Sequence, residues 1–184
     1  RNIAESVSEV TGDLIIVISA FGKTTNSLEK VLKAWINGDA LYNNLLDEIY
    51  LYHNSVIAEL FADKRAVSGH IDNSFAKLKE YLSAGKKDVY DLEYDQVVSC
   101  GELWSTIIVA DFLKTIMADI EWIDIRGNLL TDDRFRDANI LWSETRNRVQ
   151  KVFDFSANRI YITQGFIGGT LSGQTTTLGR EGSD

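Results

Sequence analysis

Apolar positions near the start of the chain predict a helix, a strand and a second helix in succession. Apolar residues at three- and four-residue spacing indicate a helix over residues 1–10, and Gly12 marks its end. Residues 14–18 form an unbroken, mostly β-branched run, which predicts a strand buried on both faces, as in a parallel sheet. A small polar loop at residues 19–26 should lead into the next helix. Because ligands of open α/β sheets bind beyond the carboxyl ends of strands, this loop is a candidate binding segment.

The next part of the chain, about residues 27–94, is predicted to be mostly helical. A second helix is expected at residues 72–84, with an apolar face of its own. We find no catalytic signature in this part, so we interpret it as a helical insertion that packs beside a sheet. Its longest apolar stripe at helical spacing consists of Leu41, Leu45, Leu46, Ile49, Tyr52, Val56 and Leu60.

Residues 95–114 predict a helix that is apolar on almost every side and therefore buried. A polar stripe nevertheless runs along it, through Ser99, Glu102 and Ser105 or Thr106. A buried carboxylate is costly unless a cation or several donors meet it. Two interpretations remain open: Glu102 is exposed or pairs with a structural arginine, or it faces a cleft and awaits a cationic group of a ligand.

Two further strands and a helix complete the expected sheet. Residues 121–125 and 159–163 predict strands, and the amphipathic helix between them should cover residues 137–155, with Asp137 as its N-cap. The recurrence of strand, helix and strand predicts an α/β fold: a mostly parallel sheet sandwiched between helices, with the helical insertion after the first strand. Paired glycines beyond the last strand also predict a β-hairpin.

Composition narrows the classes of function. The chain has 184 residues, 45% hydrophobic and 25% charged, with a net charge of −8. It can therefore form one globular domain, and its charge argues against nucleic acid as a partner. A single cysteine, Cys100, is expected to be a packing residue and favours a reducing, cytoplasmic location. No apolar run approaches the roughly 18 residues that cross a bilayer, so we expect no membrane partner.

Metal-ligating residues are scarce in the sequence. His53 and His70 are isolated from one another, and we expect both on the surface rather than at a metal. The glycine-rich turn at residues 179–184 offers backbone N–H groups, a guanidinium, a hydroxyl and a carboxylate, which together can bind an anion. Taken alone, such a turn is more often only a turn.

Several segments together resemble the aspartate kinases of the amino acid kinase superfamily. In that order and approximate spacing the sequence contains Ser19-Ala-Phe-Gly-Lys-Thr-Thr-Asn26, Ser99-Cys-Gly-Glu102, Ile162-Thr-Gln-Gly-Phe-Ile-Gly168 and Thr175-Thr-Thr-Leu-Gly-Arg-Glu-Gly-Ser-Asp184. Trp122-Ile-Asp-Ile-Arg126, followed by Thr131-Asp-Asp-Arg-Phe135, is similar to the monofunctional, lysine-sensitive branch. The resemblance covers essentially the whole chain.

This resemblance implies an activity and its partners. Aspartate kinases transfer the γ-phosphoryl group of ATP to the side-chain carboxylate of L-aspartate, which gives 4-phospho-L-aspartate, the first step toward lysine, threonine and methionine. ATP and Mg²⁺ are the implied cofactors, and a homodimer is implied for the full-length protein. Residues 1–184 would form part of the N-terminal kinase catalytic domain.

The resemblance also assigns site residues. Glu102 would meet the substrate ammonium group, and Arg180 would grip a substrate carboxylate through its planar fork. Asp184 would organise the reacting groups as the catalytic residue. The remaining substrate contacts would come from Thr25, Glu181, Gly182 and Ser183, with Ser19 in a supporting role; Lys23 is expected to be merely solvated.

Two departures from the family pattern affect these expectations. The usual Lys-Phe-Gly-Gly-Thr-Ser loop, which carries the main catalytic lysine, is absent, as are the rest of the nucleotide subsite and the ACT-type regulatory domains. We therefore expect a fragment incomplete at both ends and inactive on its own. Glu181 also replaces a usual glycine, which would strain the backbone if that position requires a positive φ.

Two alternatives to aspartate kinase remain open. A sister kinase could act on another carboxylate, such as that of glutamate or acetylglutamate, with the same fold and chemistry. A catalytically silent domain could instead bind a ligand or form dimers, and the missing lysine loop favours that alternative if the gene lacks the loop.

Overall fold

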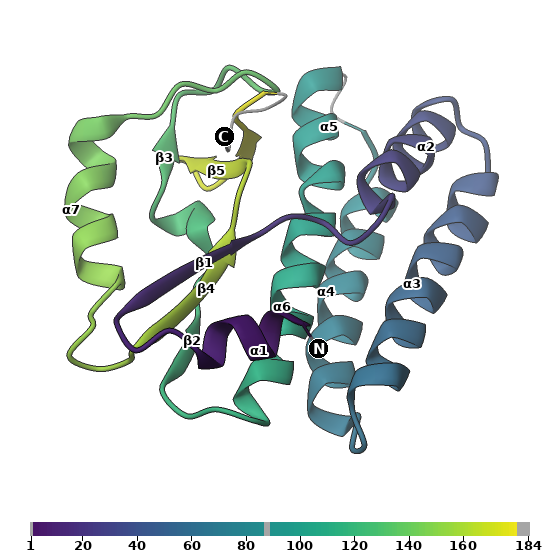
Figure 1. The fold of residues 1–184 in the computed structure, drawn as a ribbon. Helices are drawn as coiled ribbons and strands as arrows, with labels where there is room; N and C mark the ends of the chain where they lie inside the picture. Colours follow the sequence, from purple (N-terminus) through teal and green to yellow (C-terminus); the bar gives the residue numbers. More distant parts are fainter. Residues whose placement is uncertain (1, 87–88, 180–184) are drawn as a thin grey trace.

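The computed structural model describes residues 2–86 and 89–179, with side chains from residue 4 onward (Figure 1). The N-terminal helix and the first strand lie where the sequence predicts them. In chain order the elements are α1 (Asn2–Ser8), β1 (Leu14–Ile18), α2 (Thr24–Ile36), α3 (Leu41–Leu60), α4 (Arg65–Ser83), α5 (Tyr90–Val98), α6 (Cys100–Lys114), β2 (Ile120–Trp122), η1 (Ile125–Gly127), β3 (Leu130–Thr131), α7 (Trp142–Val152), β4 (Ile160–Gln164), β5 (Ile167–Thr170) and β6 (Thr175–Thr177).

The architecture is α/β, as the sequence predicts, with two small sheets. The first has the strand order β1-β4-β2, and both of its pairings are parallel. The second has the order β3-β5-β6, in which β3 and β5 are parallel and β5 and β6 form the predicted antiparallel hairpin. The second sheet was not expected as a separate unit, because its strand β3 is only two residues long.

Helices α5 and α6 occupy the centre of the molecule. In Figure 1 they run between the helices α2, α3 and α4 on one side and the two sheets on the other. On the sheet side, Val109, Ala110 and Leu113 of α6 pack against Ile160 and Ile162 of β4. This helical pair therefore joins the predicted helical insertion to the sheet.

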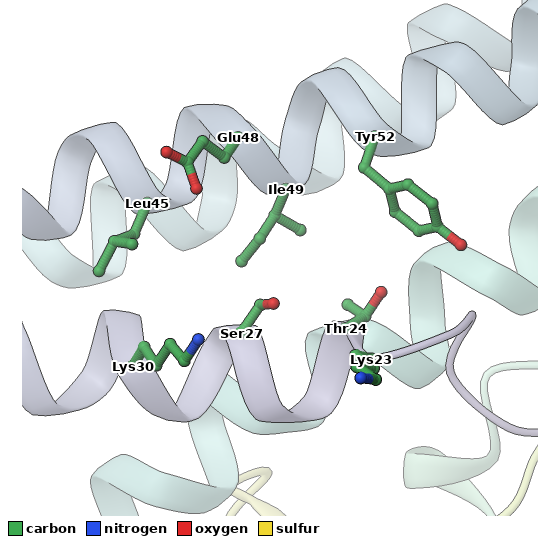
Figure 2. Close-up of a pocket in the computed structure, with 8 residues that line it drawn as sticks. All are labelled: Lys23, Thr24, Ser27, Lys30, Leu45, Glu48, Ile49 and Tyr52. Atoms are coloured by element: carbon green, nitrogen blue, oxygen red, sulfur yellow. The ribbon is translucent and has the colours of Figure 1, made fainter.

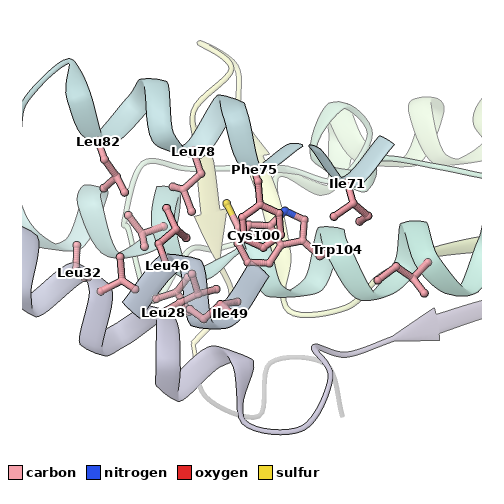
Figure 3. Close-up of a cluster of buried hydrophobic side chains, with 14 of the residues drawn as sticks. Leu28, Leu32, Leu46, Ile49, Ile71, Phe75, Leu78, Leu82, Cys100 and Trp104 are labelled. Carbon is pink, nitrogen blue, oxygen red and sulfur yellow. The ribbon is translucent and has the colours of Figure 1, made fainter. Parts of the chain in front are cut away.

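The larger core lies on the opposite side of α6, among the helices (Figure 3). Its centre is a stacked pair of rings, Phe75 of α4 and Trp104 of α6, whose centroids are 3.7 Å apart. Cys100 is buried here as a packing residue, as predicted.

The two histidines differ in their exposure. The surface position predicted for His53 is wrong: it lies on the core-facing side of α3, and its ring is enclosed by aromatic side chains that include Trp104. His70 is exposed, as expected.

Residues Tyr90–Lys114, which include α5 and α6, form the one helical stretch among the described residues that is long and apolar enough to cross a membrane by length and composition. In this fold 78% of its most apolar window is buried against the rest of the chain. Packing on both sides accounts for its hydropathy, so the stretch is the central helix of the core. The sequence pattern had predicted this burial.

Two further expectations, about the first strand and the last helix, are wrong. Strand β1 is not buried on both faces: Ile15 and Val17 are 41% and 57% exposed, because β1 is an edge strand and α7 covers that face of the sheet only in part. The predicted helix at residues 137–155 begins only at Trp142, since the chain before it is extended and bridges β3 at Ile140. Asp137 therefore lies in a loop and caps no helix.

Candidate active site

Glu102 lies in the first turn of α6, and only 6% of it is exposed. Its Oε1 accepts a hydrogen bond of 3.0 Å from the backbone N–H of Ala20, in the loop that follows β1. Glu102 is therefore buried rather than exposed. It pairs with no arginine among the residues that the structure describes. The helix instead presents this carboxylate to the carboxyl end of a strand, where ligands of α/β sheets bind.

Gly101 explains how helix and loop come this close. A Cβ atom built at Gly101 would lie 3.0 Å from the Cβ of Ala20 and 3.2 Å from the Cγ2 of Thr24. A larger residue would push α6 away from the loop and lengthen the bond between Glu102 and Ala20. The adjacent glycine and glutamate of the Ser-Cys-Gly-Glu segment thus act together in the structure.

The second carboxylate oxygen of Glu102, Oε2, is buried and has no hydrogen-bond partner among the described residues. Burial raises the pKa of Glu102 to about 7, and the hydrogen bond from Ala20 only partly opposes that rise. A buried oxygen with free acceptor capacity suits a donor supplied by a ligand. A substrate ammonium group would provide both the donor and the charge that favours the ionised carboxylate.

The neighbouring strand β4 is fixed to α6 by a buried polar network. The side chain of Gln164 donates to Thr106 Oγ1 at 2.8 Å and accepts from the backbone N–H of Ile125 at 2.9 Å. Thr106 Oγ1 also accepts from the indole of Trp122 at 3.0 Å. Sequence reasoning placed Gln164 in a family segment but gave it no role; here it aligns the end of β4 with the helix that carries Glu102.

The chain that leads to Arg180 reaches the same edge of the sheet. Ile18 of β1 pairs with Gln164 of β4, so the loops that follow these two parallel strands are neighbours. One loop contains Ala20, which binds Glu102, and the other contains Phe166, whose carbonyl accepts a 2.9 Å hydrogen bond from Leu178 N–H. Gly179 follows with φ of +85°, a conformation that favours glycine.

Other predicted site residues are placed less centrally. Thr25 is half-buried in the first turn of α2, and Ser19 is exposed at the end of β1. Thr24, which sequence reasoning did not single out, is the buried hydroxyl of this turn and donates to the carbonyl of Phe21. The predicted residues Arg180, Glu181, Gly182, Ser183 and Asp184 lie outside the described residues.

A separate cavity of about 330 Å³ lies between α2 and α3 (Figure 2). Leu45, Glu48, Ile49 and Tyr52 reach into it from α3, opposite Ser27 and Lys30 of α2. Lys23 lines its rim and is exposed, consistent with the expectation that it is solvated. Glu102 does not contribute to this cavity, so it is not the site built around the carboxylate.

Metal coordination by the protein has no candidate in the described part of the chain. Residues 2–86 and 89–179 contain no group of three or more His, Cys, Asp or Glu side chains that could hold an ion. The described site is one buried acid, two strand-end loops and the start of a glycine-rich turn.

The sequence matches the Amino acid kinase family over residues 1–184, and the chain belongs to that family. Its curated relatives include a bifunctional aspartokinase/homoserine dehydrogenase 2 of Arabidopsis thaliana, 25% identical over all of this chain and 21% of the relative. Lysine-sensitive aspartokinase 3 of Escherichia coli K12 is 37% identical over 49% of this chain and 20% of its own length.

Among solved structures, E. coli aspartokinase III in complex with aspartate and ADP superposes with a TM-score of 0.85 at 27% identity. The match covers 98% of this chain and 40% of that one. The chain thus spans about a fifth of the Arabidopsis relative and about two fifths of the solved E. coli aspartokinase III. The predicted fold, a mostly parallel sheet flanked by helices, agrees with that of the aspartokinase.

Proposed function

We propose that this chain is the aspartate-binding part of an aspartate kinase, an enzyme that transfers the γ-phosphoryl group of ATP to the side-chain carboxylate of L-aspartate. The observation that carries the proposal is Glu102, a buried acid at the carboxyl edge of the sheet. One of its oxygens accepts from Ala20, and the other has no partner within residues 2–86 and 89–179. Support comes from the solved relative, which binds aspartate and ADP at a similar fold.

Phosphoryl transfer to a carboxylate needs little help from a general base. The nucleophile is a carboxylate that is already ionised near neutral pH, so the task is to bring one anion against a polyanion. Glu102 would hold the substrate by its ammonium group, at the end opposite the reacting carboxylate. As the family resemblance implies, Arg180 would bind a substrate carboxylate and Asp184 would organise the reacting groups. The remaining substrate contacts would come from Thr25, Glu181, Gly182 and Ser183, with Ser19 in a supporting role.

The net charge of −8 means that any positive potential for the phosphates must be local. ATP with Mg²⁺ is the proposed cofactor pair, and the metal would supply charge neutralisation at the transferring phosphoryl group. We assign none of the described residues to it. A homodimer in the cytoplasm remains our expectation for the full-length protein, and the single cysteine supports a reducing location.

The test is an ADP-release assay on the full-length protein that carries this chain, with L-aspartate, L-glutamate and N-acetyl-L-glutamate as acceptors. We expect activity with L-aspartate, and a loss of about 100-fold or more in kcat/KM for aspartate on Glu102→Ala, because a charged contact is lost. Arg180→Ala should show a loss of similar size.

Glu93→Gln is the matched control. Glu93 is another buried acid of the same central helix, but it accepts a hydrogen bond from Tyr81 on the helical side. Its replacement should affect stability and leave the KM for aspartate unchanged. Activity with glutamate or acetylglutamate alone would establish the sister kinase, and ligand binding without turnover would establish the silent domain. A near-normal KM in both the Glu102 and Arg180 variants would defeat the assignment.

A further inference from the structure

Asp95, in the last turn of α5, is a second buried carboxylate, with 0% of the residue exposed. Its Oδ2 accepts 2.9 Å hydrogen bonds from the backbone N–H groups of Arg136 and Thr177. Its Oδ1 accepts a 2.7 Å bond from the hydroxyl of Thr177. The guanidinium of Arg136 turns elsewhere, to Asp91, so backbone and hydroxyl donors hold this carboxylate.

The neighbouring residue, Gln96, grips the same strand two residues earlier. Its amide N–H donates to the carbonyl of Thr175 at 2.8 Å, and its carbonyl accepts from Thr175 N–H at 3.3 Å. Strand β6 pairs with β5 on one side only, so its other edge would expose these backbone groups. The side chains of Asp95 and Gln96 form hydrogen bonds with the backbone at this edge, as a neighbouring strand would, and so fix β6 to α5.

This anchored strand leads directly toward the predicted substrate residues. Gly179 is two residues beyond Thr177, and Arg180 follows it in the sequence. A Cβ at Gly179 would lie 3.5 Å from the carbonyl oxygen of Arg136, the residue whose N–H Asp95 also binds. The same carboxylate therefore holds both the strand before the turn and the loop that packs against its first residue.

Asp95 is also linked to Glu102 through the helix. The two acids are seven residues apart, and Ser99 between them keeps helical angles, with φ of −59° and ψ of −22°. Seven residues make about two helical turns, so the two side chains leave the same face of the central helix. One rigid element thus carries the acid that would bind the substrate ammonium group and the acid that anchors β6.

We propose that Asp95 is a positioning residue for aspartate binding: it sets where the chain leaves β6 toward residues 180–184, relative to Glu102. The inference rests on the proposed function. Asp95 touches no substrate; it acts through Thr177 and Arg136. An asparagine at this position can keep the contacts, with its carbonyl accepting both N–H groups and its amide donating to the Thr177 hydroxyl.

The experiment measures kcat, the KM for aspartate, the KM for ATP and the melting temperature of the full-length protein. The variants are Asp95→Ala, Asp95→Asn and Thr177→Val. Thr145→Val is the matched control, because Thr145 is also buried. Its hydroxyl accepts from Leu130 N–H at 2.9 Å and donates to the Leu130 carbonyl at 3.2 Å, which links α7 to β3. Thr177→Val and Thr145→Val each replace a buried hydroxyl by a methyl group, so both should lower the melting temperature.

We expect Asp95→Ala to raise the KM for aspartate about tenfold and Thr177→Val about threefold, since each removes contacts that place the turn. Asp95→Asn and Thr145→Val should leave it near the wild-type value, and the KM for ATP should change little throughout. A KM in Asp95→Ala that is no higher than in Thr145→Val would overturn the inference, and so would an Asp95→Asn variant as impaired as the alanine variant. Wild-type protein without aspartate-dependent ADP release would instead refute the proposed function.

Discussion

Two carboxylates on one face of the central helix, Asp95 and Glu102, differ in how completely the fold satisfies them. Both are buried, at 0% and 6% exposure. Asp95 accepts three hydrogen bonds from two segments of the chain, whereas Glu102 accepts one from Ala20 and has a free Oε2 among the described residues. Burial is common to both, so it is the unfilled acceptor that distinguishes a binding residue from an anchoring one.

The difference has an energetic meaning. A buried acid whose two oxygens both accept hydrogen bonds contributes to stability, because removing it would leave its donors without partners. A buried acid with a free oxygen destabilises the empty protein, and that cost is recovered only when a ligand supplies the missing donor.

The largest expected effect is the loss of stability when Asp95 is replaced by alanine. Asp95→Ala should lower the free energy of unfolding by about 3 kcal/mol, because the buried N–H and hydroxyl of Thr177 and the part-buried N–H of Arg136 lose their acceptor. Chemical denaturation at pH 7 measures the change, with Thr145→Val as the comparison. A loss below about 1 kcal/mol would show that water or another residue satisfies these donors, and the two acids would no longer differ.

Replacement of Glu102 should change the free energy of unfolding in the opposite direction. Glu102→Gln should raise the free energy of unfolding by about 2 kcal/mol at pH 8, because it removes a buried charge while its amide still accepts from Ala20. The pKa of Glu102 in the folded protein is raised from 4.5 to about 7, so its favourable contribution is complete below pH 4.5 and is lost as the pH rises through 7. The difference between the variant and wild type should therefore shrink toward acid pH, and an equal difference at pH 4 and pH 8 would contradict this origin.

The pH dependence of substrate binding comes next. Only ionised Glu102 pairs with an ammonium group, so kcat/KM for aspartate should fall up to about tenfold for each pH unit below 7 and level off above it. Steady-state kinetics of the full-length protein between pH 5.5 and 8.5 provides the profile. The Glu102→Gln variant should lose this limb of the profile, and a variant that retains it would place the titration on another group.

The smallest effect is expected at Gly101. Gly101→Ala places a methyl group 3.0 Å from the Cβ of Ala20, so the loop must move by a few tenths of an ångström. The gain in helix propensity offsets part of the strain, and the net change in unfolding free energy should stay within about 1 kcal/mol. The KM for aspartate should nevertheless rise about threefold because the bond between Ala20 and Glu102 lengthens. Unchanged KM would mean that the close approach is not needed for binding.

The hydrophobic pattern predicted the elements better than their surroundings. It identified the strand Leu14–Ile18 and the buried helix that carries Glu102, since apolar periodicity reports which residues leave water. It did not reveal that Ile15 and Val17 stay partly exposed, because their apolar character is the same whether or not a helix covers them. Similarly, the aromatic cage around His53 is built by residues from α4 and α6 that no local pattern connects.

For the site, the sequence identified the kinds of residue involved, and the structure identified which residues they bind. Glu102 was recognised as an acid on an apolar helix and by its place in a family segment. Its partner could not be found that way, because Ala20 contributes a backbone N–H, which every residue except proline has. Asp95 and Gln96 carried no motif signal at all, and their role depends on an edge of β6 that only the folded sheet defines.

By itself, the sequence determined an α/β fold with a costly acid at the centre of its longest apolar helix, since composition and periodicity are local properties. The kinase family came from the resemblance of several motif segments and not from that pattern. Only the tertiary structure decided which of the two acids is saturated and which is left open. Hydrogen-bond satisfaction depends on donors brought from distant segments. Ala20 donates to Glu102 and Thr177 donates to Asp95, and in each pair the two residues are 82 positions apart in the sequence.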